Sequence, residues 1–140
     1  MPFKEEEWLN RIKGLEEAAL LLKQHQLTKD PTLLEGALWH IWRFAEYAMN
    51  AGLELSDART DRGHDMGGTA QLLHGKHMLK SDHGKVLAQL ELYRQKVEYG
   101  SFARKSSVHF VGSNVADCLR CAEEIRDDLE PHLRQRGKLS

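Results

Sequence analysis

Cysteine, proline and long apolar runs are scarce in this chain of 140 residues. Its two cysteines cannot form the disulfide framework that holds small secreted domains together. Three prolines and no low-complexity tract exclude collagen-like and linker-like sequences. No apolar run approaches the roughly 20 residues that a transmembrane helix requires, and the acidic N-terminus lacks the basic and apolar regions of a signal peptide. We therefore expect a single cytoplasmic domain, residues 1–140, with no membrane contact.

A strong net charge is also missing, since acidic and basic side chains leave the chain at −1. This balance excludes a nucleic-acid binder that is basic over its whole surface, but it leaves room for a local basic patch. Residues 59–112 carry nine basic and five acidic side chains, whereas residues 1–58 carry six basic and ten acidic ones. An anionic partner is therefore expected to meet the middle segment.

Apolar residues recur in steps of three and four through most of the chain, which is the period of an α-helix with one buried face. Such stripes run over 8–22, 34–52, 86–97 and 115–133. A shorter helix is expected over about 65–76. No segment alternates apolar and polar residues convincingly, so no sheet is expected. The sequence predicts an all-α fold, an up-and-down bundle of four long helices plus a short helix.

Capping residues set the predicted helix starts. Asp30 precedes Pro31, which is a strong start signal because the carboxylate accepts from free backbone amides and proline fits the first turn. By the same reasoning, Ser81 or Asp82 is expected to cap the third long helix. Ser113 is expected to cap the last one.

Glycines set two of the predicted stops. Gly100 and Gly137 follow apolar stripes, and glycine adopts the left-handed conformation of a helix end at little cost. The predicted core takes one stripe from each long helix and contains Trp8, Ile12, Leu38, Ile41, Ala45, Leu90, Val97, Leu119, Ile125 and Leu129.

Cys118 and Cys121 form a C-x-x-C pair inside the last predicted helix. A redox pair and half of a zinc site are the two functional interpretations. Zinc would need two further ligands, and thioredoxin-like chemistry places its cysteines at a helix start beside a sheet. The better interpretation is that both cysteines are small buried apolar side chains.

Four of the eight histidines cluster within twenty residues, namely His64, His74, His77 and His83. A metal-binding helical bundle is therefore one alternative function. However, no carboxylate lies three or four residues from His74 or His77, as helical metal sites usually require. We assign no metal ligand and no cofactor.

The spacing R-x4-H occurs twice, from Arg59 to His64 and from Arg104 to His109. The pair suits phosphodiester chemistry, because arginine holds a phosphate with a permanently charged fork and histidine transfers protons near neutral pH. Ten arginines and eight histidines in this length make such spacings common by chance, so each pair has solvated loop charges as its alternative interpretation.

The segment Ala45-Glu46-Tyr47-Ala48-Met49-Asn50-Ala51-Gly52-Leu53 is followed by a loop and then by His64-Asp65-Met66. This order resembles the HEPN domain family, in which a helix of the form A-E-x-A-x-K-A-x-L leads into a T-H-D-L-like turn and a short helix. Asn50 stands where lysine is usual, and Gly63 replaces the common threonine. The resemblance covers about 10–75 best, and the remainder agrees in helix order.

The resemblance implies a helical bundle that commonly dimerises and acts on RNA. Many members are metal-independent ribonucleases, often toxins or defence effectors, with an R-x4–6-H motif near the start of the last long helix. Arg104 and His109 occupy that place, although Lys105 stands where the family usually has asparagine, aspartate or histidine. Other members lack the motif and bind a partner, in some cases a nucleotidyltransferase.

Two main hypotheses follow. The first, which we prefer, is a HEPN-like module that binds RNA, a nucleotide or a protein partner such as a nucleotidyltransferase or an antitoxin. The alternative is a ribonuclease in which Arg104 binds the scissile phosphate and His109 is the general acid or base. In both, the RNA-binding or nucleotide-binding residues are Arg94, Lys96, Arg104 and Lys105.

A homodimer is also expected. The family commonly dimerises, and the chain has more apolar residues than one small core needs. The residues in excess are Leu20, Leu21, Trp39, Phe44 and Leu92.

Overall fold

The computed structural model describes residues 2–56, 65–98 and 110–140 and contains only helices and their connections within these ranges. The helices are α1 (Glu5–Thr28), α2 (Pro31–Leu55), α3 (Met66–Gly75), α4 (Gly84–Glu98) and α6 (Gly112–Gln135). The prediction of an all-α bundle with four long helices and a short one is confirmed. None of the described helices is long and apolar enough to cross a membrane.

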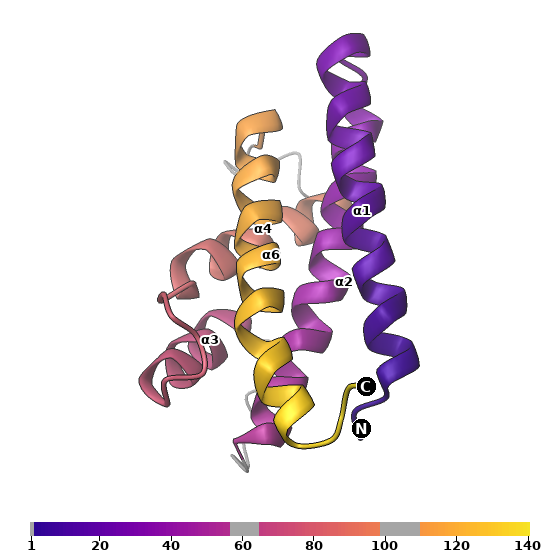
Figure 1. Ribbon diagram of the computed structural model, residues 1–140. Helices are drawn as coiled ribbons and strands as arrows, with labels where there is room; N and C mark the ends of the chain where they lie inside the picture. The colour runs from indigo at the N-terminus through magenta and orange to yellow at the C-terminus, as the bar shows by residue number, and fades with distance from the viewer. Residues whose placement is uncertain (1, 57–64, 99–109) are drawn as a thin grey trace.

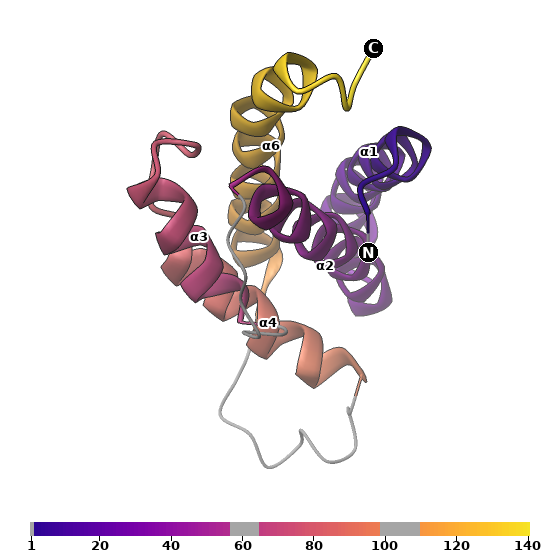
Figure 2. The same cartoon turned by 90° about the horizontal axis from the view of Figure 1, so that it is seen from below.

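The α2 helix is the centre of the bundle. It packs against α1, α3, α4 and α6, and a view from below shows the other helices arranged around it (Figure 2). The helices α1, α2 and α6 run lengthwise beside one another, while α3 and α4 cover one flank of this group (Figure 1). A helix that is covered on most sides must be apolar on most sides, and twelve residues of α2 are buried.

Local capping contacts explain where the helices begin. The side chain of Asp30 accepts a hydrogen bond from the Thr32 amide at 3.0 Å, and Pro31 is the first residue of α2, as predicted. Asp65 caps α3 through the Gly68 amide at 3.0 Å. Of the two residues proposed at the start of α4, Asp82 accepts from the Gly84 amide at 2.9 Å.

The start of α6 differs from the predicted cap, whereas its end agrees with the predicted stop at Gly137. Ser113 lies inside the first turn and does not cap the helix, because the side chain of Asn114 reaches back to accept from the Val111 amide at 2.9 Å. The helix then continues through Pro131 and ends before Gly137, whose φ of 72° is the left-handed conformation predicted there. The other predicted stop, Gly100, lies outside the described residues.

Most of the predicted core is buried, and two members are corrected. Ile12 and Val97 are only partly buried and pack against the core from its edge. Conversely, the sequence predicts Phe44 among the excess apolar residues, but its side chain is 0% exposed, with its ring centroid 5.1 Å from that of Trp8. The reason is that α2 buries several faces, so a residue off its main stripe still meets a neighbour. The predicted core residues that are buried are Trp8, Leu38, Ile41, Ala45, Leu90, Leu119, Ile125 and Leu129.

Glycine allows α3 and α4 to approach each other closely. A Cβ atom on Gly67 would lie only 2.9 Å from the backbone oxygen of Gly84. A backbone atom cannot move aside as a flexible side chain can, so any larger residue at Gly67 would push the two helices apart.

Candidate nucleic-acid interface

The five residues predicted for the site divide between described and undescribed parts of the chain. Arg104, Lys105 and His109 lie outside the described residues. Arg94 and Lys96 lie near the C-terminal end of α4, with Lys96 in its last turn. The structure therefore gives a helical position to Arg94 and Lys96 only.

Aromatic rings join α4 to the chain that precedes α6. The ring centroid of Tyr93 lies 5.4 Å from that of Phe110. Tyr93 is next to Arg94 in the sequence, and Phe110 is next to His109. Phe110, the first described residue after that pair in the sequence, thus packs on the helix that carries Arg94.

An arginine and two tryptophans form a stacked group where α4 packs on α2. The guanidinium carbon of Arg94 lies 4.3 Å from the ring centroid of Trp42, within the range of a cation–π contact. Trp42 stacks on Trp39, with ring centroids 5.6 Å apart and ring planes 20° apart. The two tryptophans meet because residues three apart on a helix are neighbours on its surface.

This group extends from the interior to the surface. Trp42 is 7% exposed, whereas Trp39 is 44% exposed. The guanidinium carbon of Arg43 lies 6.0 Å from the Trp39 ring centroid, so a second cation stands at the exposed end. We call Arg94, Trp42, Trp39 and Arg43 the Arg–Trp array. An exposed aromatic face beside positive charge can stack a nucleobase and contact its phosphates.

Only Arg94 of these four residues is predicted from the sequence as a binding residue. The signal for the others is the run Trp39-x-x-Trp42-Arg43 on a predicted helix, which puts two rings and a cation on adjoining positions. Which ring meets Arg94 depends on how α4 crosses α2. Helical periodicity does not contain that information.

A pocket of about 320 Å³ opens between α1 and α2 and shares Arg43 with the array. We call it the α1–α2 pocket. One wall is fixed by Arg11, whose guanidinium donates to the backbone oxygen of Arg43 at 2.8 Å and to the Glu7 carboxylate at 2.6 Å. The hydrogen bond from Arg11 holds the pKa of Glu7 below its ordinary value. The lining residues are Asn10, Arg11, Lys13, Gly14, Glu17, His40 and Arg43.

A second cavity, of about 890 Å³, lies between the N-terminal segment and α2 and also includes Arg11. We call it the terminal cavity. Its lining is more acidic, with three glutamates and two cations. The lining residues are Pro2, Phe3, Lys4, Glu7, Arg11, Glu46, Tyr47, Asn50, Ala51 and Glu54.

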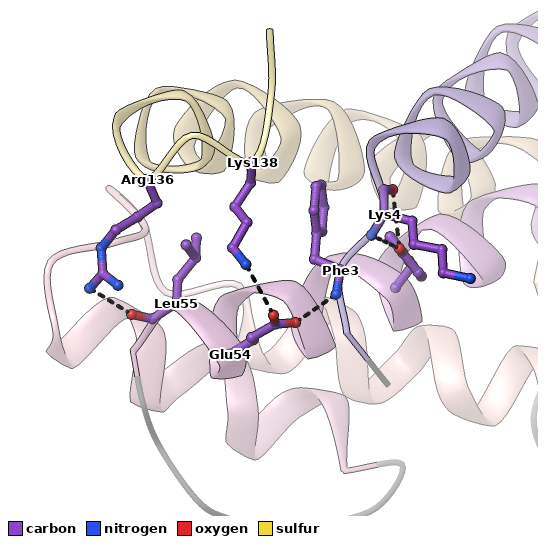
Figure 3. Close-up of polar contacts among 7 residues, drawn as sticks. Phe3, Lys4, Glu54, Leu55, Arg136 and Lys138 are labelled. Carbon is purple, nitrogen blue, oxygen red and sulfur yellow. Dashed lines mark hydrogen bonds and ion pairs between the residues drawn. The ribbon is translucent and has the colours of Figure 1, made fainter.

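The polar groups at the terminal cavity join three separate parts of the chain (Figure 3). Glu54 on α2 accepts from the Phe3 amide at 2.9 Å and lies 3.5 Å from the ammonium group of Lys138. The Lys4 amide donates to the Tyr47 hydroxyl at 2.9 Å. Arg136 donates to the backbone oxygen of Leu55 at 3.1 Å. These contacts attach both ends of the described chain to the C-terminal end of α2.

The cysteine pair is structural. Cys118 and Cys121 are buried, and burial raises the pKa of each thiol to about 12. Thiols of this kind stay protonated at neutral pH, so they are poor nucleophiles and poor metal ligands. The interpretation of the pair as buried apolar side chains agrees with this environment.

The histidine cluster does not come together as a metal site in the described part of the chain, where no group of three or more potential ligands is found. His74 is in contact with the backbone oxygen of Leu79 through Nδ1 at 3.0 Å. His83 is buried at 6% exposure, and His77 is exposed. His64, together with Arg59, lies outside the described residues.

Comparison with known proteins identifies no relative. No protein-family model matches the chain, and neither a curated protein nor a solved structure matches it. The assignment of function therefore depends on the residues themselves.

Proposed function

We propose that this protein is a HEPN-like helical module that binds single-stranded RNA or a nucleotide, with a base stacked on Trp39. The observation that carries the proposal is the Arg–Trp array. Its exposed tryptophan is backed by a second ring, which fixes its orientation and lowers the entropy cost of ordering it on binding. Lys96 on the same helix as Arg94, and Arg104 and Lys105 beyond it, supply charge for the phosphates.

The direct test measures binding of a labelled single-stranded RNA of about 12 nucleotides, a length within the usual site sizes, by fluorescence anisotropy. Trp39→Ala should weaken binding about 5- to 150-fold, since one stacked base contributes about 1–3 kcal/mol. Trp39→Tyr should restore most of the affinity because it keeps an aromatic face. Arg120→Ala is the control, since Arg120 is an exposed arginine on α6 paired with Asp117.

Two outcomes would contradict this proposal. The first is no binding by the wild-type protein at low salt, where phosphate contacts are strongest. The second is equal binding by the wild-type protein and Trp39→Ala, because the array would then contribute nothing to affinity.

The alternative is a ribonuclease. His109 directly precedes Phe110, whose ring packs on Tyr93, the neighbour of the predicted RNA-binding residue Arg94. In this alternative Arg104 binds the scissile phosphate and His109 transfers the proton. The same RNA incubated with EDTA should be cleaved by the wild-type protein and about 100- to 10,000-fold more slowly by His109→Ala. Equal cleavage by both proteins would remove the alternative.

We also propose that the protein forms a homodimer through α1. Leu9, Leu20 and Leu27 are 49%, 54% and 86% exposed. Their spacings of eleven and seven residues put them on one face of the helix. Light scattering should give twice 16.0 kDa for the wild-type protein and 16.0 kDa for Leu20→Glu. A nucleotidyltransferase or an antitoxin as the partner stays a prediction from the resemblance.

A further inference from the structure

We infer that the α1–α2 pocket is a phosphate-binding site, a role that no sequence motif indicates. Three cations, Arg11, Lys13 and Arg43, line the pocket. Arg11 is paired with Glu7, whereas neither Lys13 nor Arg43 forms an ion pair with another residue in the described ranges. Like charges at one pocket raise each other's energy, and a bound anion relieves this repulsion. The contact of Arg43 with the Trp39 ring is a cation–π contact that uses no hydrogen bond. The guanidinium N–H groups of Arg43 have no acceptor among the described residues, so they are available to a ligand.

Hydrogen-bonding groups complete the pocket. His40 lines it, and neither ring nitrogen has a hydrogen-bond partner among the residues that the structure describes. Gly14 makes room for this ring, because a Cβ atom there would lie 3.2 Å from Nδ1 of His40. The amide of Asn10 adds a further donor. Together these side chains offer donors from two helices to a single small anion.

The chemistry of the lining favours phosphate over sulfate. Phosphate accepts several hydrogen bonds and still carries a proton near neutral pH, whereas sulfate carries none. The Glu17 carboxylate in the lining can accept a hydrogen bond from the O–H group of phosphate, and it would repel an anion that has no such proton. The volume of about 320 Å³ is at the lower end for small-molecule sites, so a phosphate group fits together with part of its ester.

The test uses inorganic phosphate and the full chain, by isothermal titration calorimetry at constant ionic strength set with sodium chloride. Lys13→Ala should weaken phosphate binding about tenfold or more, since a hydrogen bond to a charged group is lost. Gly14→Ala should also weaken binding, although it changes no charge, because the added methyl group enters the pocket and displaces the His40 ring. Lys23→Ala removes an exposed lysine farther along the same helix and should have no effect.

Three results would overturn the inference: no saturable phosphate binding by the wild-type protein, equal weakening by Lys23→Ala and Lys13→Ala, or equally tight binding of sulfate. The melting temperature of each variant without phosphate shows that it is folded. Trp39→Ala should retain phosphate binding, so failure of the stacking proposal and failure of this inference are distinguishable.

A second experiment identifies the source of the phosphate group, and its interpretation rests on the proposed RNA binding. RNA with a 5′-phosphate is compared with the same RNA ending in a 5′-hydroxyl. A preference of about tenfold for the phosphorylated RNA, lost in Lys13→Ala, would assign the pocket to an RNA end. Equal affinity for the two RNAs, together with saturable binding of inorganic phosphate, would assign it to free phosphate or a small phosphate ester.

Discussion

The two pockets that meet at Arg11 differ in what their polar groups already contact. At the terminal cavity, Glu54 binds the Phe3 amide and Lys138, and Tyr47 binds Lys4. In the α1–α2 pocket, Lys13 and His40 have no such partner within the described residues. A polar group that is already satisfied stabilises the fold, whereas one that faces a pocket without a partner is available to a ligand. Substitutions around the terminal cavity should therefore reduce stability, and substitutions in the α1–α2 pocket should reduce binding.

The largest expected loss of folding stability comes from substituting Trp8, a core residue that packs on Phe3 in the lining of the terminal cavity. Trp8 is 0% exposed, packs on Phe3 and Phe44, and donates through its indole N–H to Glu130 at 3.0 Å. Trp8→Ala should lower the free energy of unfolding by about 3–5 kcal/mol. Trp39→Ala should cost less than about 1.5 kcal/mol, because it mainly loses its aromatic pair. Urea denaturation measures the free energy of unfolding of both variants. Equal losses in the two variants would contradict the expected difference between the buried and the exposed tryptophan.

The next largest difference in folding stability is expected between alanine substitutions at two helical glycines, Gly67 and Gly14. Gly67→Ala should destabilise the protein by about 1–3 kcal/mol, since its Cβ would meet the Gly84 backbone oxygen. Gly14→Ala should stay within about 1 kcal/mol of wild type, because the half-buried His40 ring can move and alanine favours the helix. Gly75→Ala, with no atom within 4 Å of the added methyl group, is the control for Gly67→Ala. Thermal melts of all three variants check this order, which a stable Gly67→Ala would contradict.

Loss of the carboxylate that joins the two chain ends should have a moderate effect. Glu54→Ala removes the acceptor for the Phe3 amide and the partly exposed contact with Lys138, for a cost of about 1–2 kcal/mol. Affinity for RNA and for phosphate should not change. Glu16→Ala, at an exposed position of α1, should stay within about 0.5 kcal/mol. A change in phosphate affinity in Glu54→Ala would show that the two pockets are coupled.

The smallest expected effect concerns the ion pair at the boundary of the two pockets. The pKa of Glu7 is lower in the folded protein than in the unfolded chain, because Arg11 hydrogen-bonds to its carboxylate. At pH values between the folded-state and unfolded-state pKa of Glu7, the unfolded chain therefore binds more protons than the folded protein does. The stabilisation is complete above the unfolded-state pKa of about 4.3 and disappears as the pH falls through the lower folded-state value.

The difference in stability between wild type and Glu7→Gln should accordingly be below about 1 kcal/mol at pH 7, since the pair is partly exposed. It should vanish in strong acid. Urea denaturation across this pH range measures the difference. A difference that grows as the pH falls would have the wrong sign for an ion pair.

Local features of the sequence predicted the helices well. Asp30 and Asp82 were both predicted at helix starts, and each accepts from a backbone amide two residues later, at the start of α2 and of α4. Ser113 failed as a predicted cap because Asn114, one residue later, bonds to the Val111 amide instead. Choosing among several capping residues within one turn depends on small differences in backbone geometry that composition does not encode.

Predictions of burial were weaker where a residue lies off the main apolar stripe. Ile12 is on the stripe of α1 and is only partly buried, whereas Phe44 is off the stripe of α2 and fully buried. A central helix buries several faces and a peripheral helix buries one. The sequence does not state which helix is central, because that depends on all the pairwise packings together.

The sequence by itself determined the helical spans and the cap of α2, because these depend on contacts between residues a few positions apart. It also determined the local basic charge of the middle segment, which is a matter of composition. Only the tertiary structure decided which polar groups are satisfied. The Phe3 amide reaches Glu54 across 51 positions of the chain, and Arg11 reaches the backbone of Arg43 across 32. Contacts of this length are fixed by how whole helices pack, so Lys13 and Arg43 become neighbours at one pocket only when α1 and α2 lie side by side.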